Sequence, residues 1–244
     1  MYNKANEMNA AWMKEVRGLK KEGLLPKDQR ILLAAEEIFS CYGYEKTTID
    51  EIIALADVGK GTVYKYFGNK EGLFYKLVQD KNGPFVENLQ KAVDGGRTLE
   101  EKLVGFFKVM IAFYYENTAL WQIICFEMLG ANNGCRVQRV NGGVEVVPRF
   151  SRIEVTEETK ERVLRYHKLL ADEFTILYRV LADALAAGEL KEDDDPDISC
   201  KYIFFGVAMS IFNPGQTMRQ KLSSDEAAAI VVDRFLHGDM KREF

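Results

Sequence analysis

Three lysines fall within eleven residues of the chain, in a stretch whose residue types suit the binding of phosphate. Lys60, Lys65 and Lys70 carry the charges, two tyrosines stand among them, and no acidic residue occurs from Val58 to Lys70. Ammonium and phenol groups commonly contact the phosphate oxygens of nucleic acids. The small residues of the run 59–62 would let the first backbone N–H groups of a helix approach an anion. The stretch predicts a phosphate-contacting surface, with an ordinary solvated helix face as the alternative.

Other patterns that resemble sites of chemistry are incomplete. The run 59–62 is not a nucleotide-binding loop, because Ala54 replaces its leading glycine and Gly61 follows the lysine where Ser or Thr is required. The acidic run 193–195 precedes Pro196, as acidic residues at a helix N-terminus do. No metal-ligand spacing occurs among Cys41, Cys125, Cys135, Cys200, His167 and His237. We expect no metal, no cofactor, no catalytic residue and no enzyme activity, and we expect each cysteine to be buried as a small apolar residue.

The elements that would position the basic stretch follow from the spacing of apolar side chains. A helix is predicted from Asp28 to Gly43, because glycine commonly ends helices. Thr48 and Glu51 have the spacing of a capping box, which predicts a second helix starting at Thr48. The buried face of the first helix should consist of Ile31, Ala35, Ile38, Phe39 and Tyr42.

The second helix should end at residues 56–58, and a third short helix should follow over 59–67. Asn69 is expected to cap a fourth helix, which we expect to break at Gly83-Pro84. Two short helices joined by a tight turn and packed on a preceding helix form a helix-turn-helix. Such a unit presents its second helix to the major groove of DNA.

The run from Asp28 to Leu77 resembles the DNA-binding domain of the TetR family of bacterial transcriptional regulators. Two segments carry the resemblance: Thr47-Thr48-Ile49-Asp50-Glu51-Ile52-Ile53 and Val58-Gly59-Lys60-Gly61-Thr62-Val63-Tyr64-Lys65-Tyr66-Phe67-Gly68-Asn69-Lys70-Glu71-Gly72-Leu73. The resemblance implies an all-helical homodimer that binds double-stranded DNA at a palindromic operator. It also implies that a small ligand entering the C-terminal domain releases the operator.

The resemblance further implies which residues contact DNA. They are Thr47, Thr48, Lys60, Gly61, Thr62, Tyr64, Lys65, Tyr66 and Lys70. Many family members have Ser or Ala where this chain has Gly59, so we expect only the backbone N–H of Gly59 to contribute. A dimer would place two copies of the 59–67 helix in successive major grooves, about 34–36 Å apart.

The rest of the chain has helical patterns, with one exception. They cover residues 99–114, 119–129, 156–187, 196–212 and 224–237, with a break at 213–215 and a short amphipathic helix over 8–21. Residues 136–147 alternate around Asn141-Gly142 and predict a small β-hairpin insertion, with an irregular loop as the alternative. The predicted fold is all-α: an N-terminal extension (1–27), a helix-turn-helix DNA-binding domain (28–76) and an effector-binding and dimerisation domain (77–244).

The helices of the C-terminal domain carry many large apolar residues and few internal charges. This composition suits a pocket for a small apolar or amphipathic effector, and simple core packing is the alternative. The candidate ligand-binding residues are Phe106, Met110, Phe113, Tyr114, Trp121, Cys125, Met128, Tyr166, Leu170 and Phe174.

Dimerisation is predicted through the helices near 157–187 and 196–212, two from each chain, as a four-helix bundle. The same faces could instead close the core of one chain. The predicted function is a ligand-released repressor. The alternatives are an activator with the same motif and an effector-independent architectural or protein-interaction factor. A filled C-terminal core would favour the effector-independent factor, and an enclosed apolar cavity would favour the repressor.

The charge of the chain is unevenly distributed. The formal net charge is −4, which argues against a wholly basic protein that coats nucleic acid. Residues 1–80 contain 12 basic and 12 acidic side chains, so the acidic surplus lies in residues 81–244. Because basic and acidic side chains are equal in number in residues 1–80, we expect few phosphate contacts per monomer. The sequence shows neither a signal-peptide pattern nor an apolar run of about 20 residues, so we expect a cytoplasmic protein that does not enter membranes.

Overall fold

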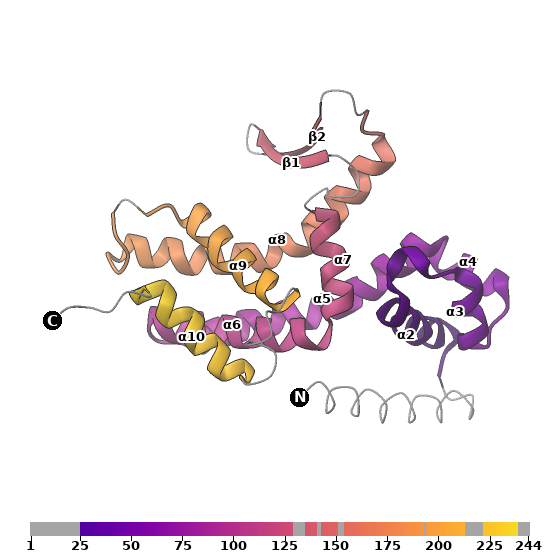
Figure 1. The fold of residues 1–244 in the computed structure, drawn as a ribbon, viewed down its shortest axis with the longest axis horizontal. Helices are drawn as coiled ribbons and strands as arrows, with labels where there is room; N and C mark the ends of the chain where they lie inside the picture. The colour runs from indigo at the N-terminus through magenta and orange to yellow at the C-terminus, as the bar shows by residue number, and fades with distance from the viewer. Residues whose placement is uncertain are drawn as a thin grey trace. The chain divides into compact units, whose positions relative to one another are not determined.

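The computed structural model describes residues 25–128, 135–140, 143–150, 154–192, 194–212 and 222–238 (Figure 1). The helix expected over 8–21, the hairpin turn at 141–142 and the break at 213–215 lie outside the described residues. Contacts between residues divide the chain into two units that meet between Gly83 and Pro84.

The first unit is a small helical domain. Its helices are α2 (Lys27–Lys46), α3 (Ile49–Ala56), α4 (Lys60–Phe67) and the first part of α5 (Lys70–Gly95). Phe39 of α2 meets Phe74 of α5 edge-on, with ring centroids 5.1 Å apart. The buried apolar residues of these helices include Ile31, Ala34, Ala35, Phe39, Ile52, Ala56, Val63, Leu73 and Phe74. The predicted three-helix core is therefore confirmed.

The predicted helix ends of this unit are confirmed, but two residues of the predicted buried face differ: Ile38 is half-buried and Tyr42 is exposed. Gly43 has φ 76°, which interrupts α2 where its end was predicted. The Thr48 hydroxyl accepts a hydrogen bond from the Glu51 backbone N–H at 3.3 Å, and a Glu51 carboxylate oxygen accepts one from the Thr48 N–H at 2.8 Å. The prediction that Tyr42 is buried is wrong, because its side chain is 59% exposed. Tyr42 directly precedes the interruption, while Tyr44 beyond it supplies the ring that stacks on Phe39.

The predicted break at Gly83-Pro84 is also wrong. α5 runs without interruption from Lys70 to Gly95 with Pro84 inside it. A proline in a helix interior removes one hydrogen bond and costs about 3 kcal/mol. Buried side chains on both sides of Pro84 offset this cost: Leu77, Val78, Phe85 and Leu89.

The second unit is a helical bundle with one small sheet. Its helices are α6 (Leu99–Glu116), α7 (Thr118–Met128), α8 (Glu157–Ala186), α9 (Pro196–Phe212) and α10 (Ser224–His237). α10 packs along α6, and α9 packs along α8 (Figure 1). Thr156 caps α8 as predicted, and further capping boxes start α6 at Thr98 and α10 at Ser223. The all-α prediction is confirmed.

The predicted hairpin is confirmed. Strands β1 (Cys135–Val140) and β2 (Gly143–Pro148) pair antiparallel, with Cys135 opposite Pro148 and Val137 opposite Val146. Cys135 and Val146 pack with Val163 near the start of α8. Because side chains alternate across a strand, the apolar set of the hairpin faces α8 while neighbours such as Arg136 and Glu145 are exposed.

The cysteines divide into two kinds. Cys125, Cys135 and Cys200 are buried as predicted, whereas Cys41 is exposed, which corrects the prediction for that residue. Cys41 lies in α2 between Ser40 and Tyr42, which are exposed as well. The prediction failed because Cys41 falls outside the apolar stripe of its helix.

Candidate functional site

A tight turn joins α3 to α4 and is held in place from α2. Asp57 takes a left-handed conformation (φ 52°) where α3 ends. The Arg30 guanidinium donates hydrogen bonds to the carbonyl oxygen of Ala56, 2.7 Å from Nη2, and to that of Asp57. The last carbonyls of a helix have no partner within the helix. Arg30 therefore fixes α2 to this turn and sets the direction in which α4 leaves it.

The exposed side chains of α4 are those predicted to contact DNA. Exposed are Lys60, Gly61, Tyr64, Lys65 and Tyr66, with Thr62 half-buried. Tyr64 is 45% exposed and Tyr66 54% exposed, so both rings and their hydroxyl groups are accessible to a partner. Val63 is buried and anchors the helix to the core. The first turn has neither an acidic residue nor a side-chain cap at Gly59, so its backbone N–H groups remain for an anion.

The Lys60 ammonium is paired with a carboxylate of the neighbouring helix. Its Nζ lies 2.9 Å from Oδ1 of Asp50 in the first turn of α3, and both side chains are exposed. The hydrogen bond to Asp50, together with the charge of Asp50, raises the pKa of Lys60. A phosphate approaching Lys60 would have to compete with this carboxylate.

Asp50→Asn should therefore strengthen the DNA binding predicted for this face. Exposed ion pairs are weak, so freeing Lys60 should raise the affinity by about two- to fivefold at low salt. Fluorescence anisotropy with a labelled operator would measure the gain. Asp80→Asn removes the same charge from α5 and should leave the affinity unchanged. Equal affinities for Asp50→Asn and the wild type would show that Asp50 does not compete with the phosphate.

The other predicted DNA contacts are engaged within the protein. Thr47 is 2% exposed, and its hydroxyl donates a hydrogen bond to the Gly43 carbonyl oxygen at 2.7 Å. The Lys70 ammonium donates to the carbonyl oxygens of Tyr44 (2.9 Å) and Thr47 (3.1 Å). Thr48 is exposed and serves as the cap of α3. Contact with DNA by these three residues stays a prediction, and their hydrogen bonds give each a positioning role.

The predicted ligand-binding residues are packed in the interior of the second unit. Buried are Phe106, Met110, Tyr114, Trp121, Cys125, Tyr166 and Leu170; Phe113 and Phe174 are half-buried; the side chain of Met128 lies outside the described residues. Phe113 stacks on Phe85 with ring centroids 3.8 Å apart, and it meets Trp121 edge-on at 4.4 Å. Side chains occupy the region where a pocket was predicted, and ligand binding there stays a prediction.

A carboxyl group lies in the middle of this aromatic interior. Glu173 of α8 is fully buried, and its Oε2 accepts a hydrogen bond from the Tyr114 hydroxyl at 2.8 Å. Burial raises the pKa of Glu173 to about 8, although the hydrogen bond from Tyr114 lowers it in part. The expectation of few internal charges missed this residue. Its position seven residues after Tyr166 and three after Leu170 places it on the buried stripe of α8 and could have revealed it.

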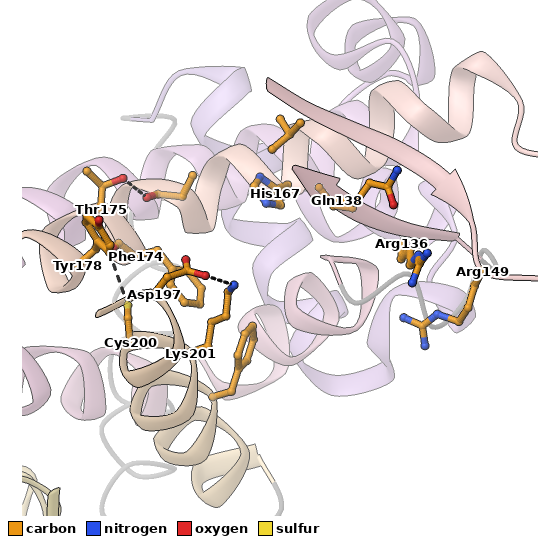
Figure 2. Close-up of a pocket in the computed structure, with 14 residues that line it drawn as sticks. Arg136, Gln138, Arg149, His167, Phe174, Thr175, Tyr178, Asp197, Cys200 and Lys201 are labelled. Carbon is orange, nitrogen blue, oxygen red and sulfur yellow. Dashed lines mark hydrogen bonds and ion pairs between the residues drawn. The ribbon is translucent and has the colours of Figure 1, made fainter. Parts of the chain in front are cut away.

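A separate groove lies between the hairpin, α8 and α9 (Figure 2). Its volume is about 710 Å³. Arg136 and Arg149 line it from the hairpin side, and Phe174 and Tyr178 line it from α8. Phe174 is the one predicted ligand-binding residue among the side chains that line it. The sequence analysis missed the groove because it depends on how the hairpin packs against helices distant in the sequence.

Comparison with known proteins identifies the helix-turn-helix. Residues 31–77 match the family model of bacterial regulatory proteins of the tetR family. Over 179 residues the chain is 25% identical to the fatty acid metabolism regulator protein of Bacillus subtilis, covering 73% of this chain and 78% of that protein. The protein is a transcriptional regulator of the TetR type. Its helix-turn-helix consists of α3 and α4.

The fold of this TetR-type regulator resembles solved structures over most of its length. FadR from Bacillus halodurans is 21% identical with a TM-score of 0.64, covering 89% of this chain and 98% of that chain. FadR from Bacillus subtilis, solved in complex with stearoyl-CoA, is also 21% identical with a TM-score of 0.64, covering 87% and 99%. These proteins are transcriptional regulators and not enzymes, as the sequence predicted for this chain.

Two further observations concern the described part of the regulator. None of its described helices is long and apolar enough to cross a membrane. Among the same residues, no group of three or more His, Cys, Asp or Glu side chains could hold a metal ion.

Proposed function

We propose that this TetR-type regulator is a homodimeric repressor that leaves a palindromic operator when an amphipathic ligand of the acyl-CoA class binds. The observation that carries the proposal is the exposed basic and aromatic face of α4, joined to a helical domain that continues the similarity to a fatty acid metabolism regulator. FadR from Bacillus subtilis has been solved with stearoyl-CoA, which supports this ligand class.

The proposed DNA surface consists of α4 and the start of α3. Lys60, Lys65 and the backbone N–H groups at the N-terminus of α4 would contact phosphates, and Tyr64 and Tyr66 would reach phosphates or base edges. Thr48, Gly61 and Thr62 complete the surface, while Thr47 at the end of α2 and Lys70 at the start of α5 brace it. The binding should depend on salt because each phosphate contact releases counterions, and the dependence should be modest because few phosphates are contacted.

The proposed dimer forms through α8 and α9. Gly206 and Ala186 are exposed and Ser210 is half-buried on these helices, which permits close approach of a second copy. Ile203 and Val207 from the same predicted set are buried within the monomer and instead close its core. A four-helix bundle from two chains is a common arrangement for such helices.

The proposed ligand site is the aromatic interior around Glu173. An acyl chain would enter by displacing side chains such as Phe113, because contacts there are apolar and aromatic. The Tyr114–Glu173 pair gives this interior a polar group that could contact the polar end of the acyl chain. A ligand that binds the expanded form better than the packed form would shift the population away from the DNA-bound state.

A titration with stearoyl-CoA tests the proposal. Operator affinity, measured by anisotropy on DNA from upstream of its own gene, should fall about 5- to 150-fold at saturation. In a Trp12→Phe background the fluorescence of buried Trp121 should change over the same range of concentrations. Free coenzyme A, which lacks the acyl chain, should produce neither effect. An operator affinity that does not change when stearoyl-CoA is added would contradict the proposed ligand class.

The filled interior favours a second candidate, an effector-independent DNA-bound factor. Tyr114 and Trp121 are fully buried and Phe113 packs against both of them. Under this candidate the regulator binds its operator with the same affinity whatever acyl compound is added. An activator would share the operator binding and differ in raising transcription from the adjacent promoter, which a reporter assay measures.

A further inference from the structure

Most of the exposed large apolar side chains of the second unit lie on or beside the hairpin, α8 and α9, with Tyr115 of α6 as the exception. From Tyr202 to its end at Phe212, α9 has no charged side chain: Phe204 and Ala208 are buried, whereas Tyr202 is 77% exposed. The large apolar side chains exposed on these elements are Val144, Phe150, Tyr178, Ile198, Tyr202 and Met209. A helix that is apolar all round is normally covered all round, and such patches mark interaction surfaces. Among the described residues this surface therefore has no covering partner.

The groove beside the hairpin continues this surface, because Val144 and Tyr178 belong to both. Its hairpin wall carries Arg136 and Arg149 (Figure 2). Phe205 of α9 also lines it. Along the helices the groove is lined by the rings of Phe174, Tyr178 and Phe205 and by the Asp197–Lys201 ion pair. Its hairpin wall is positively charged. An apolar residue flanked by carboxylates would complement it.

The turn between α8 and α9 has this complementary chemistry. Residues 187–195 contain five acidic residues and one lysine, with Leu190 among them. Glu189 and Glu192 are exposed, and neither has a cation within ion-pair distance among the described residues. The turn thus offers an apolar side chain between carboxylates that are not matched within the described chain.

Twofold symmetry would bring the turn of one chain to the groove of the other. Contacts across a twofold axis are reciprocal, and helices crossing antiparallel place the N-terminal half of each beside the C-terminal half of its partner. The groove face of α8 is centred near Phe174 and Tyr178. His167 precedes this centre by about nine residues. If the two α8 helices cross at the centre, His167 would lie beside the position of the partner's α8 that follows the centre by about nine residues. That position is next to the end of the helix at Ala186. The hairpin packs on Val163 and would meet the turn that follows.

We propose that the hairpin is an arm that holds the second copy of the chain, with the acidic segment 187–192 of the partner subunit seated in the groove between hairpin, α8 and α9. This inference rests on the proposed homodimer and adds a segment from outside the helical bundle to its interface. Arg136 and Arg149 face the partner subunit's Glu189 and Glu192. The arm makes dimer stability depend on charge as well as on apolar burial.

Charge reversal on the full chain tests the arm. The variant Arg136→Glu/Arg149→Glu and the variant Glu189→Lys/Glu192→Lys should each weaken dimerisation about tenfold or more, because both interfaces of the dimer then bring like charges together. Combining all four changes restores opposite charges and should recover the wild-type dissociation constant to within about threefold. Sedimentation equilibrium measures these constants. Arg136→Glu alone provides a milder variant in case the double change impairs folding.

Matched controls separate the arm from general charge effects. Arg165→Glu and Glu161→Lys alter exposed residues of α8 that do not line the groove, and both should dimerise normally. If the wild type is a dimer and the charge-reversal variants dimerise with the same dissociation constant, the arm is overturned and the proposed dimer is retained. A wild-type monomer at micromolar concentration would overturn the dimer and the arm together. Reversals that abolish stearoyl-CoA binding but not dimerisation would assign the groove to the ligand and overturn the arm.

Discussion

The double variant Lys60→Ala/Tyr64→Ala should weaken operator binding by at least about 100-fold. Each chain of the dimer would lose one charge and one hydroxyl contact, so four contacts disappear at once. A lost base or phosphate contact typically costs about 1–3 kcal/mol, and every 1.4 kcal/mol is about tenfold in affinity. Both side chains are exposed and absent from the core, so the fold should survive. Anisotropy on operator DNA at several salt concentrations measures the loss.

The salt dependence separates lost contacts from general damage. Removing one phosphate contact per chain should reduce the slope of log affinity against log salt by about 2 for the dimer. The control Tyr115→Ala/Lys91→Ala removes the same residue types from exposed positions of α6 and α5, and its binding should match the wild type. A Lys60→Ala/Tyr64→Ala variant with wild-type affinity and slope would remove α4 from the proposed DNA surface.

The DNA-binding unit could be predicted almost entirely from the sequence because its signals are local. A capping box needs four residues, and Thr48 with Glu51 fixed the start of α3. Gly43 marked the interruption of α2 by a backbone conformation that glycine adopts readily. The roles of Lys70 and Arg30 could not be predicted, because each side chain reaches carbonyls more than 20 residues away in the sequence.

The second unit shows where local signals fail. Pro84 is a helix breaker by local rules, yet buried residues before and after it keep α5 intact. Glu173 is a charged residue by composition, yet its place on the buried stripe of α8 brings it against Tyr114. The groove depends on the hairpin, α8 and α9 together. In each case packing between residues distant in the sequence overrides the local preference, and a short stretch of sequence does not reveal that packing.

Replacing Glu173 by Gln should change how the stability of the regulator depends on pH. Burial raises the pKa of Glu173 to about 8 in the folded protein, against its usual value of 4.5. Between these values the folded state keeps a proton that the unfolded chain has released, so rising pH destabilises the fold. The stability that Glu173 contributes is fully present below about pH 4.5 and is lost as the pH rises through about 8, a loss of up to about 5 kcal/mol. Glu173→Gln cannot titrate and should remove this loss.

The neighbours of Glu173 do not mask this signal. Burial raises the pKa of Tyr114 and of Cys125 further above their usual values, so both stay neutral between pH 5 and 8. Urea unfolding at fixed protein concentration across this range measures the difference in unfolding free energy between variant and wild type. We expect the difference to shift in favour of Glu173→Gln by several kcal/mol as the pH rises. Glu161→Gln, at an exposed position of the same helix, should follow the wild type at every pH. If Glu173→Gln ran parallel to the wild type instead, the carboxyl group would be ionised in the folded protein, and the packed interior would have to admit water or a cation beside it.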